Sequence, residues 1–352
     1  MMRSKKHVWA CCVLKASIRY PRYHLRHSQQ TGNGRETSNR MFKQVENRSV
    51  NTESSDIWSE WLLNHRHGGD AGHEKTIRAD VTRYADRVLD AAGLSEGMTL
   101  ADIGTGDGLI GFRAIERIGP SLNVLMTDVS RPMLRYAEML ANQRGIRQQC
   151  QFFNCSADSL AEIDDASVDA VATRAVLAYV VDKVAAMREF YRILKPGGRI
   201  SIAEPVLRDE AFEVCALRKL VDGIGPASDD PFFPLMLRWR SAQFPDTEEK
   251  ARQLPITNYG ERDLIRFAMD AGFTEIHLEL HIDVLPANAP SWEVFVNNSP
   301  HPLAPTLKSI LEDRFTAEER QLFVSRLRPL VESGRQLSAS RISYVTAVKP
   351  RG

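Results

Sequence analysis

The chain has 352 residues, 43% of them hydrophobic, so it can bury a sizeable core and hold one large domain or two small ones. Of its 46 basic and 45 acidic side chains, residues 1–40 carry nine and one, which leaves 37 basic against 44 acidic in the rest, a balance of about −7. A mildly acidic body excludes a broad basic surface for nucleic acid and favours small-molecule partners.

Two further features of the composition limit the class of protein. No apolar run approaches the roughly 20 residues of a membrane-spanning helix, so we expect no membrane span. The five cysteines form neither a C-x-x-C pair nor a cluster with histidine at zinc spacing, which indicates reduced, structural thiols and no metal site. They are Cys11, Cys12, Cys150, Cys155 and Cys215.

Residues 1–50 form a basic segment with few acidic side chains, and we expect a disordered tail there. The same composition is typical of an organelle transit peptide, so a mitochondrial or other organellar location is the alternative to the cytoplasmic one that we expect. A third interpretation is a start codon assigned too early, with Met41 as the true first residue. A secretory signal is disfavoured because Lys15 and Arg19 interrupt the apolar segment.

Amphipathic helices are predicted over residues 51–95. Apolar residues recur there at helical spacing, at Ile77, Val81, Tyr84 and Val88, and a Gly-Leu pair closes the segment. We interpret these helices as an N-terminal lid over the domain that follows.

Residues 96–205 alternate short apolar, strand-like runs with helical segments. This rhythm predicts a parallel sheet with helices on both faces. The predicted strands are 97–104, 123–130, 150–157, 168–174 and 198–205, and the predicted helices between them are 131–144 and 183–194.

The chain beyond residue 205 is longer than such a sheet needs. Residues 206–257 are predicted to form a helical cap insertion with an aromatic-rich loop at 229–239, which its prolines break. Residues 258–352 complete the core sheet around a second helical insertion, where Thr316 and Glu319 form a capping box. The elements that complete the sheet are a helix at 261–273 and strands at 274–285 and 341–350.

The sequence TLADIGTGDGLIGF places three glycines, Gly104, Gly106 and Gly108, directly behind an apolar run that contains Asp102. Bare backbone between a strand and a helix lets a ligand approach closely, with free N–H groups and the helix dipole facing it. The dinucleotide fingerprint G-x-G-x-x-G fails because Leu109 stands at its third glycine, so an NAD-dependent oxidoreductase is a weak alternative.

The pattern DIGTGDG resembles the first motif of the class I S-adenosylmethionine-dependent methyltransferases. Three further matches follow in order: Asp128 at the end of the second strand, the turn CSADSL, and the segment 168–205 with its LKPGG turn. The resemblance covers about residues 88–205. Within the family, the chain is distantly similar to the quinone-biosynthesis methyltransferases of the small-molecule branch. It implies a Rossmann-like, doubly wound sheet of seven strands with the last one antiparallel, and S-adenosylmethionine as the cofactor.

The resemblance also implies which residues hold the cofactor. In this family, the acid at the position of Asp128 accepts hydrogen bonds from the ribose hydroxyls, and an acid in a later turn accepts from the adenine amino group. Here Ser156 stands at the place of that second acid, so we expect a weaker hydrogen bond, with the Ala157 backbone flanking the base. The full expected set is Asp102, Gly104, Thr105, Gly106, Gly108, Asp128, Val129, Ser156, Ala157 and Arg174.

Candidates for acceptor binding and catalysis lie near the carboxyl ends of the strands, where ligands bind in this kind of sheet. We expect Arg174 to hold an anionic group or form a salt bridge, Tyr179 to line the pocket or pack, and Glu204 to act as a base or stabilise a turn. His65 and His67, in the predicted lid, are expected to deprotonate a hydroxyl acceptor or to lie in a solvated loop.

Large apolar side chains outside the sheet suggest a hydrophobic acceptor. Trp58 and Trp61 lie three apart in the predicted lid and form either an aromatic wall over the acceptor or plain helix packing. Apolar residues of the two insertions suggest an aromatic acceptor or, equally, a homodimer interface: Phe232, Phe233, Leu235, Trp239 and Trp292.

The leading hypothesis is therefore a methyltransferase that acts on an oxygen, carbon or nitrogen nucleophile of a small, partly hydrophobic molecule. A cofactor-binding protein that does not transfer methyl groups is the second hypothesis, and the departure at Ser156 favours it somewhat. A nucleic-acid methyltransferase is disfavoured by the acidic body and by TRAV, which stands where amino-methylating enzymes carry an NPPY-type motif.

Overall fold

The computed structural model describes residues 55–224, 230–286, 291–335 and 337–352. The chain divides into two units, Met1–Thr52 and Glu53–Gly352, and all described residues belong to the second. The predicted tail therefore lies outside the described residues, as do the two N-terminal cysteines. No helix of the described part is long and apolar enough to cross a membrane.

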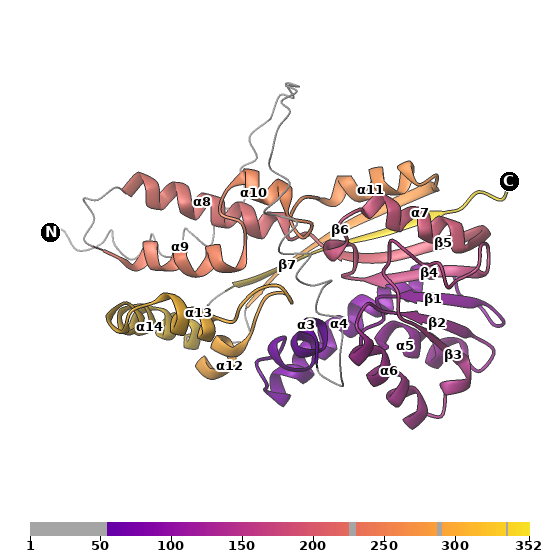
Figure 1. Ribbon diagram of the computed structural model, residues 1–352, viewed down its shortest axis with the longest axis horizontal. Coiled ribbons are helices and arrows are strands. Elements are labelled where there is room, and N and C mark those ends of the chain that lie inside the picture. The colour runs from indigo at the N-terminus through magenta and orange to yellow at the C-terminus, as the bar shows by residue number, and fades with distance from the viewer. Residues whose placement is uncertain (1–54, 225–229, 287–290, 336) are drawn as a thin grey trace, which may run out of the picture. The chain divides into compact units, whose positions relative to one another are not determined.

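A sheet of seven strands forms the centre of the described unit (Figure 1). Its strand order is β3-β2-β1-β4-β5-β7-β6, and β7 runs antiparallel to both of its neighbours. The predicted doubly wound sheet with an antiparallel last strand is thus confirmed. The strands are β1 Thr99–Ile103, β2 Asn123–Thr127, β3 Cys150–Phe153, β4 Val168–Arg174, β5 Leu194–Pro205, β6 Thr274–Pro286 and β7 Leu337–Val348.

The strand order reverses at β1, which has β2 on one side and β4 on the other. All three run parallel, and Ile103 at the end of β1 is paired with Thr127 of β2 and Thr173 of β4. The loops that leave these strands therefore share one edge of the sheet. This reversal point is where open α/β sheets bind ligands.

Helices cover both faces of the sheet, as the alternating pattern predicts (Figure 1). Helices α4, α5 and α6 bury their apolar sides in one core, and α7 and α11 bury theirs in the other, on the opposite face. The strands between them are almost entirely apolar because both faces are covered. These helices are α4 Ala71–Ala92, α5 Leu109–Ile118, α6 Arg131–Gln143, α7 Lys183–Ile193 and α11 Glu261–Asp270.

The two insertions form a helical cap with a core of its own. Helix α9 of the first insertion packs against α13 and α14 of the second, although they are far apart in the sequence (Figure 1). A smaller apolar cluster joins α8 to α9. The cap helices are α8 Arg208–Ile224, α9 Phe232–Gln243, α10 Glu248–Gln253, α12 Trp292–Asn297, α13 Leu307–Arg314 and α14 Ala317–Glu332.

The aromatic-rich loop predicted at 229–239 is wrong, because most of that segment belongs to α9. Pro231 stands at the N-cap and Pro234 in the first turn, where backbone N–H groups have no acceptor within the helix. A proline there removes no hydrogen bond, so it does not break the helix.

The apolar residues of the insertions are accounted for by the cap itself. Phe232, Leu235 and Trp292 are each at most 7% exposed in its core, where Phe323 lies with its ring centroid 5.6 Å from that of Phe232. Trp239 packs against the same cluster. The remaining member of the expected set, Phe233, packs against the smaller cluster between α8 and α9. The packing of the cap accounts for these side chains, so they are not evidence for an aromatic acceptor pocket or for a homodimer interface.

Candidate functional site

The loop between β1 and α5 needs its glycines. Gly104, Gly106 and Gly108 have φ angles of 65°, 55° and 80°, a region that side chains with a Cβ rarely adopt. A Cβ on Gly104 would lie 2.4 Å from the Val176 side chain, and one on Gly108 would lie 2.3 Å from the Phe112 ring. The loop is therefore fixed in shape by close approach on both sides.

Asp102 forms hydrogen bonds with this loop from its buried side. Its Oδ2 atom accepts a hydrogen bond from the Thr105 hydroxyl at 2.7 Å and another from the Gly111 N–H at 3.0 Å. The side chain is buried, and burial raises the pKa of its carboxyl to about 6. Asp102 and Thr105, both expected at the cofactor, thus contact each other and shape the loop from inside.

Asp128 lies directly after β2, beside the same loop. Its two oxygens accept hydrogen bonds from the Gly106 and Ser130 N–H groups, each at 2.9 Å. A carboxylate has about four acceptor sites, so two remain for the hydroxyls of a ribose. The next residue, Val129, is apolar yet 49% exposed, and it offers an apolar surface beside them. Carboxylate, glycine loop and apolar surface together fit an adenosine ligand.

The turn after β3 supplies an acid that the sequence prediction missed. The Ser156 hydroxyl donates a hydrogen bond to the Asp158 carboxylate, while Ala157 between them is buried. The turn therefore holds a carboxylate two residues after position 156, where the family acid is absent. The aspartate is visible in the sequence CSADSL, but its bond to Ser156 is seen only in the structure.

Glu204, near the end of β5, is inaccessible and fully engaged. Its carboxylate accepts hydrogen bonds from the N–H groups of Val176, Leu177 and Ala178, at 2.9 to 3.2 Å, and it is 0% exposed. Burial raises the pKa of this carboxyl, while the three backbone donors lower it. The arrangement makes Glu204 a positioning residue for the turn after β4 and corrects the expectation that it acts as a base.

The start of that turn is strained. Ala175, the residue after Arg174, has a φ of 56°, which is uncommon for a residue with a Cβ. Its N–H donates to the carbonyl of Ala203 at 2.8 Å, and the Glu204 bonds hold the next turn. Strain of this kind persists where the surroundings fix it, often at functional sites. It sets the direction in which the chain leaves Arg174.

The segment before α4 lies over this edge of the sheet. It comprises α3 (Ile57–Glu60) and a π-helical turn (Trp61–His65). The Ser130 hydroxyl donates to Asp56 at 3.0 Å, and the ring of Trp58 packs edge-on against Tyr179 with centroids 5.0 Å apart. A Cβ on Gly106 would meet the side chain of Leu62 at 3.5 Å. Residues 56–67, which we call the lid segment, therefore contact the loops after β1, β2 and β4.

The other side of the lid segment is tied to the cap. The indole N–H of Trp61 donates to the carbonyl of Ser299 at 3.0 Å, and the Ser299 N–H donates to the carbonyl of His65 at the same distance. The Asn298 side chain donates to the Arg66 carbonyl at 2.8 Å. The lid segment thus joins the loop after α12 to the cofactor edge. Trp61 is a bridge in this arrangement, and Trp58 packs on Tyr179.

The two candidate histidines lie in different surroundings. His65 ends the π-helical turn with its Nε2 atom 3.6 Å from a Glu60 carboxylate oxygen, and its side chain is 43% exposed. His67 is buried, and its Nδ1 atom has no hydrogen-bond partner among the described residues. Neither forms a hydrogen bond with Arg174 or Tyr179 within the described part of the chain.

Two half-buried arginines at this edge have no ionic partner among the described residues. Within residues that the structure describes, neither Arg66 nor Arg174 forms a hydrogen bond or ion pair through its guanidinium, although Arg66 lies over the Trp61 ring at 5.6 Å. Burial, and then the charge of Arg174, lowers the pKa of Arg66 to about 9. The sequence alone does not single out Arg66, because its partner in position, Arg174, is far away along the chain.

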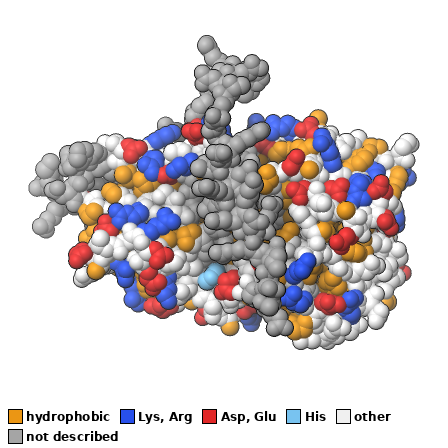
Figure 2. Space-filling view, in the orientation of Figure 1, with side chains coloured by type: hydrophobic (Ala, Val, Ile, Leu, Met, Phe, Trp, Pro, Cys, Tyr) orange, Lys and Arg blue, Asp and Glu red, His pale blue; other side chains and the backbone are white. Residues whose placement is uncertain are grey.

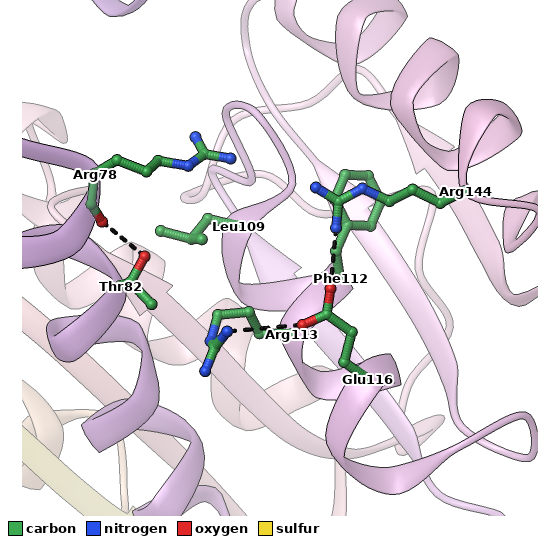
Figure 3. Close-up of a pocket in the computed structure, with 7 residues that line it drawn as sticks. All are labelled: Arg78, Thr82, Leu109, Phe112, Arg113, Glu116 and Arg144. Atoms are coloured by element: carbon green, nitrogen blue, oxygen red, sulfur yellow. Dashed lines mark hydrogen bonds and ion pairs between the residues drawn. The ribbon is translucent and has the colours of Figure 1, made fainter. Parts of the chain in front are cut away.

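A pocket on α5 shows the contrasting case (Figure 3). It has a volume of about 150 Å³ and three arginines around it, each paired with an acid. Glu116 forms ion pairs with Arg113 and with Arg144, the latter at 3.2 Å (Figure 3). Arg113 also contacts Asp86. The third, Arg78, is paired with Asp107 of the glycine loop. Because each of these arginines already has an anionic partner, the described residues of this pocket leave no unpaired positive charge that would bind an anionic ligand.

Comparisons with known proteins agree with this geometry. The family described as "Methyltransferase domain" matches residues 94–231. Nocamycin O-methyltransferase of Saccharothrix syringae is 30% identical over 60% of this chain and 71% of its own length. Two shorter matches, each over 33% of this chain, are a ubiquinone/menaquinone biosynthesis C-methyltransferase of Idiomarina loihiensis (32% identical, 46% of its length) and the tRNA 5-carboxymethoxyuridine methyltransferase of Escherichia coli (30%, 43%).

A solved structure, the YcgJ protein of Bacillus subtilis, aligns over 77% of this chain and 99% of its own with a TM-score of 0.48 and 15% identity. Fold, glycine loop and relatives define an S-adenosylmethionine-dependent enzyme that transfers methyl groups. The chain belongs to the class I S-adenosylmethionine-dependent methyltransferases, and S-adenosylmethionine is its cofactor. This membership supports methyl transfer over the two alternatives, an NAD-dependent oxidoreductase and a cofactor-binding protein without methyl transfer.

Proposed function

We propose that this methyltransferase acts on an oxygen, carbon or nitrogen nucleophile of a small, partly hydrophobic molecule. The observation that carries the proposal is the edge of the sheet where Asp128 keeps two acceptor sites free beside the glycine loop, directly under the lid segment. An acceptor that reaches this edge has to fit beneath the lid segment and beside the cap. A compact molecule meets that requirement better than a large one.

The residues have separate roles in this proposal. Asp128 accepts hydrogen bonds from the ribose, Val129 packs on the adenine, and Asp158 accepts from the adenine amino group with Ser156 as its support. The cofactor supplies a methyl group that its sulfonium already activates. The protein therefore has to bind both molecules, align the nucleophile behind the methyl group and exclude water. The lid segment serves the last purpose.

A small acceptor is favoured over RNA by the distribution of charge. One of the relatives acts on tRNA, so RNA is the competing acceptor. The body of the chain beyond residue 40 is mildly acidic, and Lys and Arg are interspersed with Asp and Glu on the face that Figure 2 shows. RNA-binding surfaces gather basic side chains to contact phosphates.

We further propose a cytoplasmic location, with an organelle as the alternative.

Calorimetry of the full chain with S-adenosylmethionine, S-adenosylhomocysteine and NAD tests the cofactor site. We expect micromolar binding of the two sulfur compounds and none of NAD. The acceptor class is tested by incubating the enzyme and methyl-labelled cofactor with a low-molecular-weight metabolite extract and, separately, with total tRNA. Label in the extract alone supports the proposal, and label in tRNA alone overturns it.

A further inference from the structure

The acceptor side of the site carries three side chains that donate hydrogen bonds. Arg66 comes from the lid segment, while Arg174 and Tyr179 come from the end of β4 and the turn that follows it. The two guanidinium groups offer five N–H donors each and cannot accept. Burial raises the pKa of the Tyr179 phenol, which keeps it in its neutral, donating form. Glu204, the nearest carboxylate of the turn, is occupied by backbone donors.

These donors are held in place from both directions. The Glu204 bonds and the left-handed Ala175 fix the direction of the chain directly after Arg174. The Asn298 side chain holds the carbonyl of Arg66 at 2.8 Å. Trp58 packs on the Tyr179 ring. The backbone at both arginines and the Tyr179 ring are thus held in place before a ligand arrives, which reduces the conformational freedom lost on binding.

The charges around Arg66 leave a positive excess. Arg174, Arg78 and Asp107 all act on its guanidinium, and the uncharged Tyr179 lies within the same range. Asp107 is already paired with Arg78, so two cations remain without an anion among the described residues. A half-buried guanidinium without a partner costs stability, which an anionic ligand would restore.

We propose, building on the proposed function, that Arg66 and Arg174 bind a carboxylate of the acceptor and that the enzyme methylates this carboxylate to a methyl ester. The end of β4 lies next to β1 and its glycine loop, so an anion held by Arg174 lies beside the cofactor. One carboxylate oxygen donates a lone pair to form the C–O bond, and the C–S bond breaks with its electron pair left on sulfur. No proton moves, because a carboxylic acid is ionised at neutral pH.

This reaction needs no base. A phenol, an alcohol or an activated carbon would have to lose a proton, whereas a carboxylate requires neither the buried Glu204 nor the histidines of the lid segment to accept one. A carboxylate needs only orientation, and bidentate contacts from arginine provide it.

The methionine carboxylate of the cofactor is an alternative ligand for the two arginines. If the arginine pair bound that group, its loss would weaken the binding of S-adenosylhomocysteine but not of 5′-methylthioadenosine, which has no carboxylate. If it binds the acceptor, neither nucleoside is affected. The two sources can therefore be separated by binding alone, without any activity.

The test uses the full chain with saturating S-adenosylhomocysteine and measures calorimetric binding of benzoate, phenylacetate and decanoate, each beside its primary amide. We expect at least one carboxylate to bind better than its amide, and Arg66→Gln and Arg174→Gln each to weaken it about tenfold or more. The matched control is Arg113→Gln, because Arg113 is a half-buried arginine already paired with acids. A carboxylate that binds is then methylated with labelled cofactor, and a methyl ester releases labelled methanol in mild alkali.

Three outcomes overturn the inference. They are no preference for any carboxylate over its amide, equal affinities in the arginine variants and the wild type, and weakened binding of S-adenosylhomocysteine alone. Binding of S-adenosylhomocysteine by the wild type keeps the proposed function intact in all three cases. If the wild type binds neither sulfur compound, the proposed function itself fails. Unchanged melting temperatures of the variants show that they fold.

Discussion

The cofactor side and the acceptor side of the site differ in how their polar groups are satisfied. Asp102, Asp128 and Ser156 all have partners within the protein, and together they hold the glycine loop and the turn after β3 in shape. Arg66 and Arg174 have none among the described residues. The first region is held in shape by the protein's own hydrogen bonds before the cofactor arrives, whereas the second has two cations whose missing anion we propose the acceptor supplies.

The difference teaches how a shared fold is adapted. A loop that holds the same cofactor in every member of a family can build its contacts into the backbone. The acceptor side depends on side chains from the lid segment and from the turn after β4, which are free to vary in sequence. Function is therefore to be argued from those side chains and not from the fold.

The largest effect is expected from Asp128→Ala. The substitution removes the acceptor of the ribose hydroxyls and the partner of the Gly106 N–H, and hydrogen bonds to a charged group contribute about 1.5–3 kcal/mol each. We expect the dissociation constant of S-adenosylhomocysteine to rise about 100-fold in calorimetry. Asp90→Asn on the exposed side of α4 is the control and leaves the constant unchanged. Unaltered affinity in the Ala variant would remove Asp128 from the cofactor site.

The second effect concerns the support of the acceptor side. Glu204→Ala leaves three N–H groups in or near the buried turn without their acceptor, and we expect a loss of about 3 kcal/mol in the free energy of unfolding. Urea unfolding measures it. Glu204→Gln keeps an oxygen acceptor and recovers part of the loss. If the Ala variant is as stable as the wild type, Glu204 does not hold the turn, and the hypothesis that it acts as a base is open again.

A pH titration tests the cofactor side. Burial raises the pKa of Asp128 to about 6, so its carboxyl is charged above that pH and protonated below it. At pH 5 about one carboxyl in ten is ionised, and we expect binding of S-adenosylhomocysteine to be about tenfold weaker than at pH 7. Asp102 titrates in the same range, so Asp128→Asn, which removes only one of the two, separates their contributions. Affinity that stays flat from pH 5 to pH 7 contradicts the assignment.

The same shifts have the opposite sign for the stability of the ligand-free protein. Between the usual pKa of 3.8 and about 6, the folded state binds more protons at Asp102 and Asp128 than the unfolded state does. Their contribution to stability is therefore lost as the pH rises through this window. Chemical unfolding at pH 4.5 and pH 6.5 measures the change in the free energy of unfolding that all titrating groups cause together. Comparison with the Asp102→Asn and Asp128→Asn variants isolates the part that these two carboxyls contribute.

The smallest effect is expected from the link between the lid segment and the cap. Trp61→Phe removes one hydrogen bond to the Ser299 carbonyl and keeps most of the ring. A single neutral hydrogen bond contributes about 1 kcal/mol, so we expect the dissociation rate of S-adenosylhomocysteine to rise about fivefold in stopped-flow measurements. Asn64→Ala, which loses only a contact to Glu60 on the exposed side, is the control. An unchanged rate would show that the lid segment opens without leaving the cap.

The sequence predicts the cofactor side better than the acceptor side for a physical reason. The glycine loop and Asp128 belong to a local pattern in which spacing along the chain determines position in space. Glu204 follows an apolar strand in the same way, but only the fold shows that three N–H groups surround it. Arg66 becomes a candidate only because the charge of Arg174 acts on it, and Arg174 lies more than 100 positions away in the sequence. Pro234 misled the prediction because its effect depends on its place within the helix.

The shared core of the cap has a consequence for engineering. Helix α9 comes from one insertion and α12, α13 and α14 from another, yet they bury one set of aromatic rings together. A chimera that exchanges only one insertion with a relative would join two halves that were never selected to fit each other. Acceptor preference carried by the cap is therefore transferable between relatives only when both insertions are grafted as a pair.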